Sequence, residues 1–276
     1  MKKILGFLLI FLLLTGCSGK SWMTVDGFEV SQDLYHYYYQ SAADQYEGDT
    51  AASEARELLR AHVAVIRFAE KYGIALSDEE KTEIDRQIQS AKNRNDDFAE
   101  QLSEQHLTEP LYRELCRHDA LREKLMAHLH ASVYTVTEEQ MREIIETEFI
   151  CARHLFFENT VEGAEQAAQA AAAQLAAGAD FDALFIEYMG EDYSDEPYLF
   201  GKGYMVEEFD AAARSLAVGQ VSGAVQTAYG WHIIYRLPLD WDAIEENWDA
   251  ITEEYIQTQI SIDMAQAAAQ YEIIEK

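Results

Sequence analysis

The stretch Gly-Trp-His-Ile-Ile-Tyr-Arg-Leu at residues 230–237 decides the fold class of the middle of the chain. β-Branched and aromatic residues dominate it, which is typical of a strand, and Pro238 closes it because proline cannot donate to a sheet ladder. Outward from this strand, the sequence from about residue 150 alternates short β-rich runs with an alanine-rich helix and glycine-punctuated turns. This texture predicts a compact α+β domain.

Helical spacing flanks this domain on both sides, with residues 241–270 as the last predicted helix. Because the apolar face of that helix needs a partner to bury against, we predict that the α+β domain is inserted into a mostly α-helical domain. Residues 23–30 predict a hairpin with Asp26 and Gly27 at its turn. Further helix signals are Ser31 and Thr50 as caps, Gly73 as a stop, capping boxes at residues 77–80 and 137–140, and Pro110 in a first turn.

The first residues are typical of an export signal, with Lys2 and Lys3 before an apolar run at residues 4–14. The sequence Leu-Thr-Gly-Cys that ends at Cys17 resembles a bacterial lipobox. This resemblance implies a signal peptide at residues 1–16 and a lipid on Cys17. The lipid would hold the chain, through a spacer at residues 17–22, on the extracytoplasmic face of the cell membrane. The alternative is an ordinary cleaved signal peptide with an incidental cysteine.

The composition narrows the classes of function. The chain has 276 residues, of which 49% are hydrophobic, so it has room for two domains with cores. Its formal net charge of −29 would repel phosphates, and binding to nucleic acid is therefore disfavoured. Cys116 and Cys151 fall in different predicted domains, so we expect two buried free thiols and no disulfide between them.

An ordered run of motifs lies between residues 151 and 237. It comprises Cys-Ala-Arg-His-Leu-Phe at 151–156, Gly-Lys-Gly-Tyr-Met-Val-Glu-Glu-Phe-Asp at 201–210, Leu-Ala-Val-Gly-Gln-Val-Ser-Gly at 216–223 and Thr-Ala-Tyr-Gly-Trp-His-Ile-Ile at 227–234. In this order the motifs resemble the parvulin family of peptidyl-prolyl cis-trans isomerases. The resemblance implies a small antiparallel sheet with flanking helices, and an enzyme that interconverts Xaa-Pro peptide bonds with no metal or organic cofactor.

The same resemblance implies a catalytic network. His154 and His232 would lie side by side on adjacent strands, and Thr227 and an acidic group would complete a set of hydrogen bonds beneath the substrate carbonyl. Asp192 is our choice for the acidic group, with Asp195 as the alternative. Two strand histidines without the surrounding motifs would more often be ordinary core residues.

Met205 and Phe209 are predicted to form the floor of a pocket for the proline ring, because residues four apart share one face of a helix. Plain core packing is the alternative for both.

Two features depart from the family pattern and put the catalytic rate in question. Residues 195–199 replace a common Gly-Gly-Asp-Leu turn, and Arg214 occupies an apolar position. The loop at residues 158–162 is acidic, so we expect no selectivity for phosphorylated Ser/Thr-Pro bonds.

Taken together, the lipobox, the helical texture and the motifs resemble the PrsA-type foldase lipoproteins, which are relatives of the SurA-type chaperones. This implies a helical chaperone domain at residues 23–148, an isomerase domain at 149–238 and a C-terminal helix at 239–276 that completes the helical domain. The implied partners are unfolded or partly folded secreted polypeptides that contain proline, and a homodimer is an oligomeric state left open. The alternative function is a membrane-anchored chaperone whose parvulin domain no longer catalyses.

Overall fold

The computed structural model describes residues 21–190, 193 and 196–276. The chain forms two compact units, of which unit 1 combines the residues up to Ala131 with Asp263–Lys276, and unit 2 is Ser132–Ile262. Unit 1 is therefore built from both ends of the chain, and the α+β part is inserted into it, as the sequence predicts. The domain limits drawn from the sequence stay a prediction.

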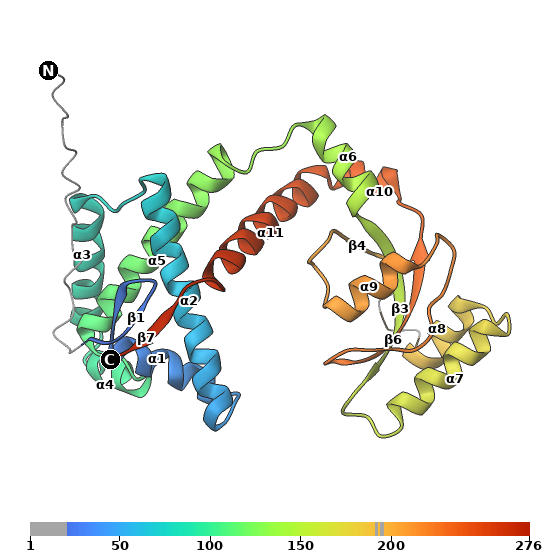
Figure 1. Ribbon diagram of the computed structural model, residues 1–276, viewed down its shortest axis with the longest axis horizontal. Coiled ribbons are helices and arrows are strands. Elements are labelled where there is room, and N and C mark those ends of the chain that lie inside the picture. Colours follow the sequence, from blue (N-terminus) through green and yellow to red (C-terminus); the bar gives the residue numbers. More distant parts are fainter. Residues whose placement is uncertain (1–20, 191–192, 194–195) are drawn as a thin grey trace, which may run out of the picture. The chain divides into compact units, whose positions relative to one another are not determined.

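Unit 1 is mostly helical and has a small three-stranded sheet. Strand β7, near the C-terminus, pairs with β1, near the start of the described chain, and the sheet order is β2-β1-β7 (Figure 1). The predicted hairpin at Asp26 and Gly27 is confirmed, with φ angles of 48° and 74° that suit its tight turn. The elements are β1 Ser21–Val25, β2 Phe28–Ser31, α1 Gln32–Ala43, α2 Gly48–Tyr72, α3 Asp78–Arg94, α4 Phe98–Glu104, α5 Glu109–Ser132 and β7 Ile273–Glu275.

Most of the predicted helix ends are confirmed. The Ser31 side chain accepts a hydrogen bond from the Leu34 amide, both capping boxes form, and Gly73 ends α2 with a left-handed φ of 68°. The predicted cap at Thr50 is wrong, because α2 already begins at Gly48 and has no side-chain cap. Asp49 in the first turn favours this earlier start, since a carboxylate is stabilised at the positive end of the helix dipole.

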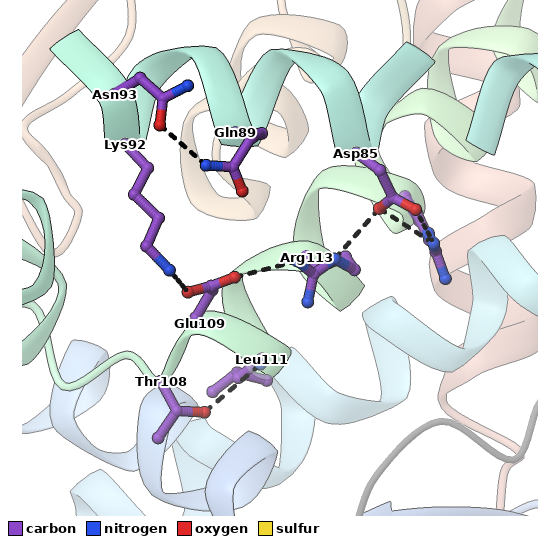
Figure 2. Close-up of polar contacts among 9 residues, drawn as sticks. Asp85, Gln89, Lys92, Asn93, Thr108, Glu109, Leu111 and Arg113 are labelled. Atoms are coloured by element: carbon purple, nitrogen blue, oxygen red, sulfur yellow. Dashed lines mark hydrogen bonds and ion pairs between the residues drawn. The ribbon is translucent and has the colours of Figure 1, made fainter. Parts of the chain in front are cut away.

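Helix α3 is attached to α5 by ion pairs as well as by apolar packing. Ile88 is its buried side chain, whereas Lys92 Nζ lies 2.7 Å from Glu109 Oε2 and Arg113 Nε lies 3.0 Å from Asp85 Oδ1 (Figure 2). Each exposed ion pair contributes little, and salt screens the attraction between its charges. We therefore expect salt to weaken the contact between the two helices. Further along the same two helices, Arg117 pairs with Asp85 and Lys124 pairs with Glu80.

Unit 2 is built around a four-stranded antiparallel sheet with the order β4-β3-β6-β5. Helices α7 and α8 pack on the face that carries Leu155 and Ile233, and α9 packs on the face that carries Ala152 and Ile234 (Figure 1). The elements are α6 Glu138–Glu148, β3 Ile150–Glu158, α7 Ala164–Ala176, α8 Phe181–Met189, β4 Tyr198–Phe200, α9 Glu207–Ser215, β5 Val225–Gln226, β6 Gly230–Leu237, α10 Trp241–Glu246 and α11 Trp248–Ala268, of which the residues from Asp263 onward belong to unit 1.

The single helix predicted over residues 241–270 is wrong, because the chain forms α10 and α11 with a break at Asn247. At this break the Ala243 carbonyl accepts two hydrogen bonds, one of 2.8 Å from the Asn247 side chain and one of 3.2 Å from the Asn247 amide. Both described cysteines are free thiols, but Cys116 is only half-buried, whereas Cys151 is buried as expected. Within the described residues, no helix is both long and apolar enough to span a membrane.

Candidate active site

The pairing of β3 with β6 brings His154 and His232 to the same face of the sheet. His154 lies opposite Ile234, and Phe156 lies opposite His232, so the two histidines are diagonal neighbours. Strand alternation turns Leu155 and Ile233 to the other face, where both are fully buried. The local register thus delivers two imidazoles to one side without any special loop.

The two imidazoles form a direct contact. Their Nδ1 atoms are 2.9 Å apart, the ring planes lie within 7° of each other, and the ring centroids are separated by 5.1 Å. A hydrogen bond between two such nitrogens needs one proton, which either ring can supply. The structure therefore brings together the two histidines that the sequence selected.

Thr227 continues the network from the other side of His232. Its hydroxyl oxygen lies 3.0 Å from His232 Nε2 and accepts a 3.1 Å hydrogen bond from the Tyr229 amide. The turn that places it is closed by the Thr227 amide, which donates to the Gly230 carbonyl at 2.8 Å. Since the hydroxyl can donate or accept, the line from Thr227 to His154 can exist in two neutral arrangements that differ in the position of the imidazole protons.

Burial keeps both imidazoles neutral at physiological pH. It lowers the pKa of His154 to about 4, because the charged form would lose hydration. Burial also lowers the pKa of His232 to about 4, and the neighbouring His154 ring lowers it further. Neither ring therefore presents a fixed positive charge, and both remain available as neutral donors and acceptors.

Aromatic rings surround the pair. The Phe209 ring stands edge-on to both imidazoles, with centroid separations of 5.4 Å to His154 and 5.3 Å to His232. Phe156 lies 4.9 Å from His232, and Tyr198 lies 5.3 Å from His154. The two histidines thus sit in apolar surroundings, which accounts for the direction of their pKa shifts.

The prediction that Met205 and Phe209 share one helical face is wrong. Helix α9 begins only at Glu207, because Val206 is extended, and Met205 lies in the preceding turn. Both side chains nevertheless belong to one apolar cluster, in which Phe209 is 4% exposed and Met205 is half-buried. Phe209 is therefore largely covered by protein, and its predicted contact with a proline ring requires the covering side chains to shift.

Arg214 forms two hydrogen bonds within unit 2, although the family pattern has an apolar residue at its position. Its Nε donates to Asp210 Oδ2 and its Nη1 donates to the Glu148 carbonyl, both at 2.7 Å. These bonds tie α9 to the end of α6, just before β3 begins. Three predicted residues, Asp192, Asp195 and Cys17, lie outside the described residues.

The contact between the rings of Tyr198 and His154 was not predicted from the sequence. Tyr198 falls within residues 195–199, where the sequence departs from the family pattern, and it is the first residue of β4, so its neighbour in space depends on the register of β4 against β3. That register follows from tertiary pairing and has no local signal in the sequence.

Comparison with known proteins agrees with this geometry. Residues 154–237 match the family model described as rotamase, PPIC-type PPIase domain. The chain carries a parvulin-type isomerase domain. The matched segment begins at the first histidine of the pair and ends with β6, so it includes His154, Thr227 and His232.

Relatives that match about seven tenths of the chain carry the name foldase protein PrsA. One from Geobacillus kaustophilus is 31% identical over 69% of this chain and 65% of its own length. Another, from Caldanaerobacter subterraneus, is 27% identical over 74% of this chain and 61% of its own. The chain is thus a relative of the PrsA foldases and spans less than two thirds of the length of these two proteins. A crystal structure of peptidylprolyl isomerase PrsA from Bacillus anthracis is 22% identical, covers 76% of this chain and 95% of its own, and has a TM-score of 0.41.

Proposed function

We propose that this protein is an extracytoplasmic foldase that catalyses cis-trans isomerisation of Xaa-Pro bonds in exported polypeptides and assists their folding. The observation that carries the proposal is the 2.9 Å contact between His154 Nδ1 and His232 Nδ1 inside a parvulin-type domain. The relationship to proteins named foldase supports the wider role. The substrates are unfolded polypeptides that contain proline.

The reaction needs no bond cleavage. Conjugation between the carbonyl and the imide nitrogen creates a barrier of about 18–20 kcal/mol to rotation, and the twisted state has lost that conjugation. The twisted imide presents a carbonyl oxygen and a nitrogen with altered electron density, and groups that bind these better than the planar form speed the reaction. Neutral imidazoles linked to Thr227 can donate to one of these atoms and adjust their protons without leaving an unpaired charge in the site.

In this proposal a lipid on Cys17 retains the mature chain at the membrane where exported clients emerge. The helical unit 1 holds segments of the client, and the isomerase domain shortens the slow proline step of their folding. Uncatalysed exchange at proline takes tens of seconds or longer, which is long enough to leave an exported chain exposed to aggregation. Mass spectrometry of the membrane-extracted protein tests the anchor, since an unmodified Cys17 would contradict it.

The catalytic test is exchange spectroscopy on a short Xaa-Pro peptide with the full mature chain. We expect clear acceleration by the unaltered protein and a loss of about 10²-fold or more in His154→Ala and His232→Ala, in line with removal of a positioned polar group. His128→Ala, a change in α5 of unit 1, is the matched control and should retain the full rate.

Two outcomes bear on different parts of the proposal. A rate equal to the uncatalysed one for the unaltered protein would show that it is not an isomerase. An active protein whose rate survives both histidine substitutions would instead remove the pair from the mechanism. A parallel aggregation assay on an unfolded client reports the holding activity, which we expect to persist in both histidine variants.

A further inference from the structure

Tyr198 combines high exposure with contact to the catalytic pair. It is the first residue of β4 and 44% of its surface is exposed, yet its ring lies edge-on to His154 with a centroid separation of 5.3 Å and an interplanar angle of 86°. Because this exposed ring lies beside the histidine pair, it offers apolar surface to a ligand at the site.

The sheet register fixes the side on which Tyr198 lies. Tyr198 is directly opposite Ala152, which is two residues before His154, so all three point to the same face of the sheet. Across the strand order β4-β3-β6, the side chains of Tyr198, His154 and His232 form a row. Tyr198 is thus the end of the row on the β4 edge.

The aromatic rings around the histidine pair differ in their exposure to solvent. Phe209 of α9 is 4% exposed and packs with Phe200 and Ile234 in an apolar cluster, so its ring is covered by protein. Tyr198 is open to an arriving chain. A polypeptide whose imide lies over His154 places its next residue one backbone step of about 3.8 Å further on, which is within side-chain reach of a ring centred 5.3 Å from the imidazole.

We propose that Tyr198 is a specificity-determining residue that contacts the side chain directly flanking the proline and favours apolar or aromatic residues there. This inference rests on the proposed isomerase function and adds a substrate class to it. A contact between an aromatic ring and an apolar side chain corresponds to a discrimination of about three- to tenfold.

The test compares two peptide series on the full mature chain. One series varies the residue before proline among Gly, Ala, Leu and Phe, and the other varies the residue after it. For the unaltered protein we expect kcat/KM to rise about three- to tenfold from Gly to Phe in one of the series. Tyr198→Ala should abolish that rise, so that the Gly and Phe peptides are converted with similar kcat/KM, and Tyr198→Phe should keep the rise.

Tyr46→Ala is the matched control, because Tyr46 is similarly exposed, at 42%, but lies in unit 1. An active protein with a flat profile in both series would overturn the assignment, as would an equal loss on every peptide in Tyr198→Ala, which would indicate a purely structural role. Absence of activity on all peptides in the unaltered protein would instead remove the isomerase function on which the inference depends.

Discussion

Acidification from pH 7 to pH 5 should leave the pair formed by His154 and His232 almost entirely neutral in the folded protein. With a pKa of about 4 in each ring, about 9% of either site is protonated at pH 5, whereas a solvent-exposed histidine of pKa 6.5 is about 97% protonated. The difference arises because burial removes the hydration that an imidazolium needs. Histidine-labelled NMR of the full chain, assigned through His154→Gln and His232→Gln, measures it directly.

The same shifts predict a loss of stability in acid. The folded pKa lies below the unfolded one, so the unfolded chain binds more protons, and the stabilisation present above pH 6.5 declines as the pH falls towards 4. A shift of this size corresponds to about 2 kcal/mol per ring between pH 7 and pH 5, or about 1–2 kcal/mol after partial screening by solvent. Amide exchange at the buried residues Leu155 and Ile233 reports the opening of unit 2.

Unit 1 contributes a similar trend, since burial also lowers the pKa values of His62 and His118. The comparison that isolates the pair is therefore the change in unit 2 opening free energy with pH in the unaltered protein and in the double variant His154→Gln with His232→Gln. We expect the double variant to lose most of the pH dependence. Titration of either ring near pH 6.5 in the folded protein, or an unchanged slope in the double variant, would refute the reasoning.

Three further experiments test the packing of unit 2 and the attachment of helix α3 in unit 1. Gly230→Ala should destabilise unit 2 by about 3 kcal/mol or more, because the added Cβ would lie 2.3 Å from the Phe157 carbonyl oxygen. Gly223→Ala is the control, since its Cβ would meet nothing within 4 Å, and it should lower the melting temperature only slightly in a thermal melt. Arg214→Met should lower the free energy of unfolding by about 3 kcal/mol, because the Asp210 carboxylate, whose side chain is 15% exposed, loses its cation. Adding Asp210→Asn should recover part of that loss. A single variant as stable as the unaltered protein would contradict this role of Arg214. Amides of α3 should exchange faster at 1 M than at 0.1 M salt, because pairs such as Lys92 with Glu109 are screened, and an unchanged rate would show that apolar contacts hold the helix.

The sequence predicted those parts of the structure that depend on local chemistry. The hairpin turn at Asp26 and Gly27, the cap at Ser31 and the stop at Gly73 each need only a residue with the right backbone preference or side-chain oxygen. The proximity of His154 and His232 followed from the order of the family motifs, and the strand register realises it. In each of these cases the information lies within a few residues or in a known motif set.

What the sequence did not predict depends on contacts between distant segments. The strand Ile273–Glu275 forms only because β1 offers a free edge at the other end of the chain. The position of Met205 before α9 follows from an extended Val206 that helical spacing did not reveal. Tyr198 reaches His154 through the pairing of β4 with β3, and a pairing between short strands has no periodic signal.

The low exposure of Phe209 changes how the site is expected to work. A floor that touches the proline ring would need open surface, whereas a ring that is 4% exposed and edge-on to both imidazoles excludes water from the pair before any substrate arrives. Because the neutral state of the two histidines depends on that exclusion, we infer that Phe209 sets their pKa values, while substrate recognition falls to the more open side chains of Met205 and Tyr198. On this view Phe209→Ala should raise the pKa of both rings towards 6.5 and lower the rate at pH 6 more than at pH 8, whereas an equal loss at both pH values would indicate that Phe209 contacts the substrate directly.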